Sequence, residues 1–119
     1  DYMFWDDERQ EEFIKKEFGW EEDDVDGTYK RYKSVECKMI GIHDYTKFVK
    51  RGFGRATDHA VKDVRAGIIT REEAFDIINK IDPKRPGTMD HFLKITGMSE
   101  DDLIKKIKAL RDGAAKKLP

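Results

Sequence analysis

The chain has 119 residues, a length that gives one domain a modest hydrophobic core and leaves too little chain for two domains. It has 24 basic and 25 acidic residues, and this balance argues against a protein that binds nucleic acid through a global positive field. Its only cysteine, Cys37, excludes an internal disulfide and a zinc site made of several cysteines. Because no apolar run approaches the roughly 20 residues needed to span a bilayer, and no signal peptide is recognisable, we expect a soluble cytoplasmic protein.

The first 42 residues are expected to form one helix followed by an arm. The opening DYMFW is strongly apolar, which is typical of a buried strand or loop continuing from a longer protein, and equally of a terminus folded back on its own helix. In DDERQEEFIKKEFG an aspartate precedes acidic residues, lysines come later and Gly19 ends the run, so a helix is predicted. The stretch TYKRYKSVECKMIGI shows no clear helical period and is interpreted as extended or irregular.

From residue 43 to residue 119 we expect a separate helical domain, so that the whole fold is mainly α: a small bundle of short helices with an irregular or extended N-terminal arm. Thr57 is a good N-cap for a helix near 57–66, and Thr70 and Glu73 fit a capping box. The last residues, GAAKKLP, are expected to be a frayed tail. The helices are predicted near 44–51, 57–66, 71–81, 88–96 and 99–112. The expected core residues are Phe48, Val61, Val64, Phe75, Ile78, Phe92, Leu93, Leu103 and Ile107.

The segment GFGRATD is a candidate anion site. It places Gly54 and Arg55 before a predicted helix, whose first N–H groups and dipole favour a phosphate or a carboxylate. The guanidinium of Arg55 would add a bidentate contact, and Arg65 would assist if the helix turns it the same way. The competing interpretation is structural: the glycines only make the turn, and Arg55 pairs with an acid such as Asp58.

Two further groups of residues are candidates for chemistry. Asp58 and His59 are the catalytic candidates, with His59 as a general base, although an exposed histidine is the more common situation. Lys30 and Lys33 lie among tyrosines in TYKRYKS, a pattern that favours contacts to phosphate and stacking on a base. The three histidines are scattered through the sequence, so no metal site is predicted.

Several stretches together resemble the C-terminal part of the N-acetyl sugar amidotransferases, which are similar to other PP-loop enzymes (N-type ATP pyrophosphatases) and are associated with lipopolysaccharide biosynthesis. They are DYMFWDDERQEEFIKKEFGW, GTYKRYKSVEC, HDYTKFVKRGFGRATDHAVKDVRAGIITREEAF and FLKITGMSEDDL. The resemblance implies conversion of the acetamido group of a nucleotide-linked N-acetyl sugar to an acetamidino group. ATP, with Mg²⁺, would activate the acetamido oxygen as an adenylate, and ammonia from a separate glutaminase subunit would displace AMP.

The glycine- and serine-rich PP-loop of that family and its paired N-terminal cysteines are not found in these residues. The chain is therefore interpreted as a fragment that pairs with an N-terminal PP-loop domain, needs no cofactor of its own and is inactive alone. The alternative is a stand-alone helical module that binds an anionic partner such as RNA, or that docks on the parent enzyme. No membrane-spanning segment is expected, and nucleic acid is not the partner that the leading interpretation predicts.

Overall fold

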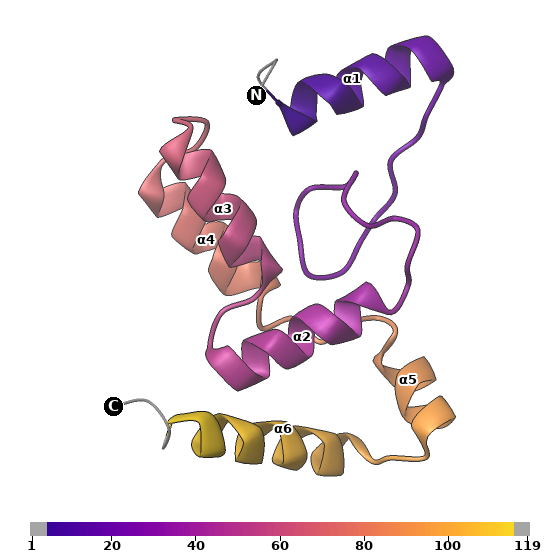
Figure 1. The fold of residues 1–119 in the computed structure, drawn as a ribbon, viewed down its shortest axis with the longest axis vertical. Helices are drawn as coiled ribbons and strands as arrows, with labels where there is room; N and C mark the ends of the chain where they lie inside the picture. The colour runs from indigo at the N-terminus through magenta and orange to yellow at the C-terminus, as the bar shows by residue number, and fades with distance from the viewer. Residues whose placement is uncertain (1–4, 116–119) are drawn as a thin grey trace.

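The computed structural model describes residues 5–115 and the side chains of residues 5–111 (Figure 1). It consists of six helices and a long irregular arm, residues 19–39, which joins the first helix to the second. In chain order the helices are α1 (Asp7–Phe18), α2 (Ile40–Arg51), α3 (Arg55–Arg65), α4 (Arg71–Ile81), α5 (Met89–Thr96) and α6 (Glu100–Ala115). No strand occurs within residues 5–115, so the predicted class is confirmed: a mainly α fold with an irregular N-terminal arm. None of these helices is long and apolar enough to span a bilayer.

Local capping signals explain where α1 and α4 begin. The Asp6 side chain accepts the backbone N–H groups of the first turn of α1, and Gly19 ends that helix with φ 64°. Thr70 and Glu73 form the predicted capping box at the start of α4. Both helices lie where the sequence predicts them. The expectations for the apolar opening and for the last residues of the tail fall on residues 1–4 and 116–119, outside the described part.

Three predicted boundaries are wrong. Helix α2 begins at Ile40 and not near residue 44, and α6 continues to Ala115 through the first part of the expected frayed tail. Helix α3 begins at Arg55, with Gly54 and not Thr57 at its N-cap. The reason for this last difference is a long-range contact: the Thr57 hydroxyl donates a hydrogen bond to Asp82, at the C-terminus of α4.

The helices pack as two groups. Helices α2 and α6 lie side by side, and with α5 they enclose a small core of four buried side chains, Ile42, Met89, Leu103 and Ile107 (Figure 1). Helices α3 and α4 form a second pair beside them. The buried apolar side chains of that pair are small, Ala56 and Ala60 on α3 and Ala74 on α4, which lets the two backbones approach closely.

The predicted core is confirmed for Leu103 and Ile107, which are 8% and 7% exposed. It is wrong for Phe75 and Val61, whose exposed fractions are 52% and 39%. The other predicted core residues, Phe48, Val64, Ile78, Phe92 and Leu93, are half-buried. Periodicity identified the apolar residues of α3 and α4, but alanines fill the contact between these helices, so the larger side chains lie at its margin.

Candidate anion-binding site

One face of α3 is turned toward the arm and bonds to it along its length. Arg55, His59 and Asp63 lie on this face because successive members are four residues apart. Each of them hydrogen-bonds a residue between positions 28 and 34. Asp63 is not among the predicted site residues, although its spacing from Arg55 and His59 is readable in the sequence.

Arg55 joins the arm to α2. Its Nη2 donates to Ser34 Oγ at 2.6 Å and its Nη1 donates to Asp44 Oδ2 at 3.4 Å. Asp44 is buried, and Ser34 has a φ of 61°, a left-handed conformation that non-glycine residues seldom adopt. The guanidinium therefore spans two segments of this chain, an arrangement closer to the structural interpretation of Arg55, with Asp44 as its partner in place of Asp58.

The N-terminus of α3 already faces a carboxylate of the same chain. Asp82 is 4% exposed, and it accepts the backbone N–H groups of Gly54 at 2.8 Å and Ala56 at 3.0 Å. A Cβ at position 54 would overlap this carboxylate. Asp82 thus accepts hydrogen bonds from backbone N–H groups that were predicted to bind an external anion. An anion site at Gly54 and Arg55 stays a prediction.

His59 is neutral at physiological pH. Burial, followed by the charges of Arg55 and Lys33, lowers the pKa of His59 to about 4. Its Nδ1 lies 2.6 Å from Thr28 Oγ1, which also accepts the Lys30 backbone N–H. Thr28 Oγ1 has a second lone pair, so this contact fits either tautomer of the neutral ring, with the Thr28 hydroxyl as donor or with Nδ1–H as donor. A group with so low a pKa is a weak base at neutral pH, so His59 is better suited to hydrogen bonding than to proton abstraction.

Asp63 and Lys30 form a buried ion pair beside this histidine. Lys30 Nζ lies 2.8 Å from Asp63 Oδ2, and the two side chains are 11% and 9% exposed. The Tyr29 hydroxyl donates a hydrogen bond to the same carboxylate, and Glu8 of α1 also bonds the Lys30 ammonium. Burial alone would lower the pKa of Lys30, but the hydrogen bonds to Asp63 and Glu8 raise it above its usual value, so the ammonium stays charged.

These groups line a hollow of about 320 Å³ between α1, the arm and α3, which we call the lysine pocket. Its cations are Lys30 and Lys33 from the arm and Lys62 from α3, and His59 contributes the neutral ring. Its carboxylates are Asp63 from α3, Asp7 and Glu8 from α1, and Asp6, the N-cap of α1. Lys33 pairs with Asp7, and this hydrogen bond is the main reason why the pKa of Asp7 is lowered. Three of the predicted site residues, Lys30, Lys33 and His59, therefore meet in one place.

The remaining predicted residues lie elsewhere. Asp58 is exposed and pairs with Lys47 of α2, and Arg65 is exposed in the last turn of α3. Neither of them lines the lysine pocket. Among the described side chains, those of residues 5–111, no cluster of three histidine, cysteine, aspartate or glutamate side chains is placed to hold a metal ion.

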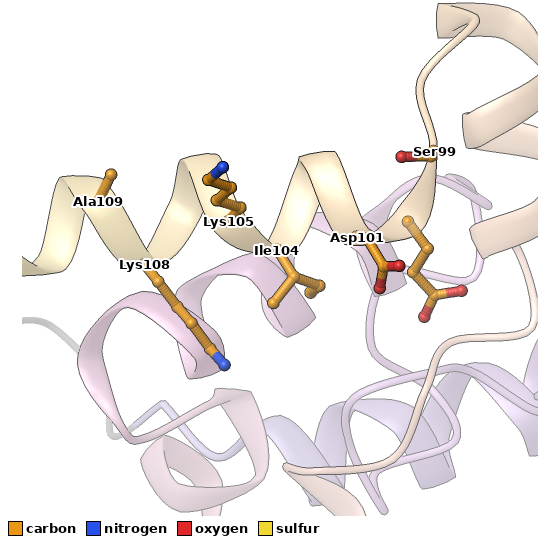
Figure 2. A pocket seen from close by; sticks show the side chains of 7 residues that line it. Ser99, Asp101, Ile104, Lys105, Lys108 and Ala109 are labelled. Carbon is orange, nitrogen blue, oxygen red and sulfur yellow. The ribbon is translucent and has the colours of Figure 1, made fainter.

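A second hollow, of about 710 Å³, runs along α6 from Ser99 to Ala109. All the residues that line it come from this one helix and the residue before it. Figure 2 shows Lys105 and Lys108 pointing away from each other and not toward a common point, with Asp101 near the start of the helix. Side chains from several elements converge on the lysine pocket but not on this surface, so the lysine pocket is the better candidate site.

A family model covers most of the residues that line the candidate site. Residues 26–116 match a family model described as "LPS biosynthesis protein WbpG-like, C-terminal domain", where LPS is lipopolysaccharide. The match includes the arm lysines and α3 but not α1, which ends at Phe18. It begins within the expected arm, and the predicted division at residue 43 stays a prediction. No curated protein matches the chain.

Proposed function

This chain belongs to the family of C-terminal domains of WbpG-like lipopolysaccharide biosynthesis proteins, and from that membership we propose that it serves an amidotransferase that acts on a nucleotide-linked N-acetyl sugar. The enzyme would convert the acetamido group of the sugar to an acetamidino group, in the cytoplasm, with ammonia from a separate glutaminase subunit. The contribution of this domain would be to hold the diphosphate that links nucleotide and sugar. The lysine pocket is where we place that contact.

The observation that supports this proposal is the convergence of three lysines on one hollow. Lys30 and Lys33 reach it from the arm, and Lys62 reaches it from α3. Its volume of about 320 Å³ lies at the lower end of the range of about 300–1,000 Å³ that is usual for ligand pockets. A ligand of that size with two phosphates would meet ammonium groups, and the neutral ring of His59, which also lines the pocket, would add a polar group without adding charge.

Binding of RNA is less well supported by the same residues. The tyrosine rings of the arm already face its own cations, with Lys33 Nζ 5.1 Å from the centroid of the Tyr32 ring and Lys30 Nζ 5.4 Å from that of Tyr29. Single-stranded nucleic acid binds best where aromatic faces are open for stacking along a positive groove. A short hollow with paired charges fits a small diphosphate better.

The residues of this chain do not fit a site for ATP with Mg²⁺. The sequence has no glycine- and serine-rich phosphate loop. The buried carboxylates Asp44, Asp63 and Asp82 each accept hydrogen bonds from donors of this chain. We therefore propose that ATP and Mg²⁺ bind in an N-terminal PP-loop domain of the parent protein, and that this domain and the glutaminase are the partners of the chain.

Calorimetric titration of the chain with UDP-N-acetylglucosamine and with inorganic pyrophosphate tests the proposal. Lys33→Gln and Lys62→Gln should each weaken binding of both ligands about tenfold, near the lower end of what a hydrogen bond to a charged group contributes. The matched control is Lys105→Gln with Lys108→Gln on α6, which removes charge far from the pocket and should leave affinity unchanged. Absence of binding, or an equal loss in the α6 variant, would contradict the proposal.

A further inference from the structure

Helix α1 is attached to the rest of the protein differently from the other helices. It has no buried residue, and its two phenylalanines, Phe13 and Phe18, are 55% and 76% exposed and contact each other edge to face. Its links to the arm are ionic: Glu8 bonds Lys30, Asp7 bonds Lys33 and Lys15 bonds Glu22. Figure 1 shows α1 set apart from the two helix groups, with the arm between it and α2.

The acids of α1 balance the charge of the lysine pocket. Three ammonium groups line this pocket, and three of its four carboxylates come from the start of α1: Asp7 and Glu8 of the first turn and Asp6 at the N-cap. Without these three residues the pocket would keep three cations and the single carboxylate of Asp63. The lysines lie within residues 26–116, which match the family of WbpG-like C-terminal domains, whereas Asp7 and Glu8 lie outside the match.

We infer that the first turn of α1 is an internal substitute for the anionic ligand of the lysine pocket, and that a diphosphate must displace this turn in order to bind. The inference rests on the function proposed above and adds a form of regulation to the same site. Asp7 and Glu8 place two carboxylates beside Lys33 and Lys30, as two phosphate groups would be placed. In the closed site, carboxylates of the same chain thus compensate the positive charge of the lysines.

Displacing α1 costs little, which makes the exchange feasible. The side chains of Asp7 and Glu8 are 36% and 43% exposed, and their partners Lys33 and Lys30 are 29% and 11% exposed. Both carboxylates are in contact with water, Lys30 keeps its ion pair with Asp63 when Glu8 leaves, and no buried apolar side chain holds α1 in place. A multiply charged ligand would therefore compete successfully with the two carboxylates.

The chain contains a reporter for the exchange. Trp5 lines the lysine pocket, and its indole N–H donates to the Asp7 carboxylate. The second tryptophan, Trp20, is remote in sequence from this turn, and Trp20→Phe would leave Trp5 as the only source of tryptophan emission. Displacement of the turn breaks the bond between Trp5 and Asp7 and should shift this emission.

The decisive comparison uses two double variants of the full chain in the Trp20→Phe background, titrated with inorganic pyrophosphate. Asp7→Asn with Glu8→Gln removes the internal anion. It should tighten binding about tenfold relative to the chain that carries Trp20→Phe alone, hereafter the parent chain. Glu12→Gln with Glu17→Gln removes the same amount of charge from the same helix, away from Lys30 and Lys33, and should leave affinity unchanged. In the parent chain pyrophosphate should shift Trp5 emission, and in the first variant the emission should be shifted before any ligand is added.

The outcomes separate this inference from the function on which it rests. If no chain binds pyrophosphate, the proposed function fails and the inference fails with it. If the parent chain binds but the Asp7 and Glu8 variant binds no more tightly than the Glu12 and Glu17 variant, the function stands and the inference is overturned. Tighter binding without any shift of Trp5 emission in the parent chain would overturn displacement, because the turn would then stay in place beside the ligand.

Discussion

A single buried carboxylate, that of Asp82, determines where α3 begins. It accepts hydrogen bonds from two backbone N–H groups, those of Gly54 and Ala56, and from the Thr57 hydroxyl at 2.5 Å. These donors come from a turn far from Asp82 in the sequence. Because Gly54 has no side chain, the carboxylate can approach the backbone closely. Asp82 thereby joins the C-terminus of α4 to the N-terminus of α3.

Replacing Asp82 with asparagine should therefore destabilise the protein. The amide keeps the shape of the carboxylate, but its NH₂ group would face N–H or O–H donors in place of an acceptor. We expect the free energy of unfolding to fall by about 2–3 kcal/mol, the scale of a lost hydrogen bond to a charged group. Urea denaturation measures this. The matched control is Asp76→Asn on the exposed face of α4, which should change stability little. An equal loss in both variants would show that the hydrogen bonds of Asp82 are not the cause of the loss.

At the scale of elements, the two helix groups are held together by different side chains. The contact between α3 and α4 is made by buried alanines, whereas α2, α5 and α6 enclose branched and sulfur-containing side chains around Ile107 and Met89. Large apolar residues of the first pair, such as Phe75, therefore lie at the margin of the contact. The Arg71 guanidinium covers the Phe75 ring at 5.5 Å from its centroid.

Truncation of one residue from each group should show this difference. Ile107→Ala should lower the free energy of unfolding by about 2–4 kcal/mol, because it leaves a cavity in the buried core. Phe75→Ala should lower it by less than about 1 kcal/mol, since half of the ring is already in contact with water. Thermal or urea unfolding of the two variants measures both values. A larger loss for Phe75→Ala than for Ile107→Ala would show that α4 buries its aromatic ring after all.

At the scale of the whole molecule, the chain is more extended than a compact domain of its length. Its radius of gyration is 16.8 Å, compared with about 13–14 Å expected for a compact domain of this size. Figure 1 shows the reason: α1 stands at one end of the molecule, and the irregular arm lies between it and the helix groups. A helix attached in this way should respond to conditions that leave the core unaffected.

Salt should therefore loosen α1 selectively. At about 1 M salt the Debye length falls to about 3 Å, and the exposed ion pairs of Asp7 and Glu8 are screened. Hydrogen exchange followed by mass spectrometry should show faster exchange across residues 7–18 at high salt than at low salt. The internal control is α6, whose buried Leu103 and Ile107 make its protection independent of ion pairs. Uniform acceleration, or none in α1, would contradict ionic attachment.

The sequence by itself determined the elements of this protein that depend on neighbouring residues. The aspartate cap of α1, the glycine stop at Gly19 and the Thr70 capping box all act within one helical turn, so their helices could be located in advance. The mainly α class and the irregular arm followed from the same short-range signals. Lys30, Lys33 and His59 were recognisable as candidates because charged and aromatic residues are dense around them.

Only the tertiary structure decided what those candidates face. The cap of α3 comes from Asp82, and the partners of the arm lysines come from α1 and α3, so no local pattern could reveal them. The contact between α3 and α4 selected alanines over Phe75 because of how closely the two helices approach. The physical reason is common to all three cases. Hydrogen bonds, ion pairs and burial depend on distance in space, and residues far apart in the chain reach one another only after the helices have packed.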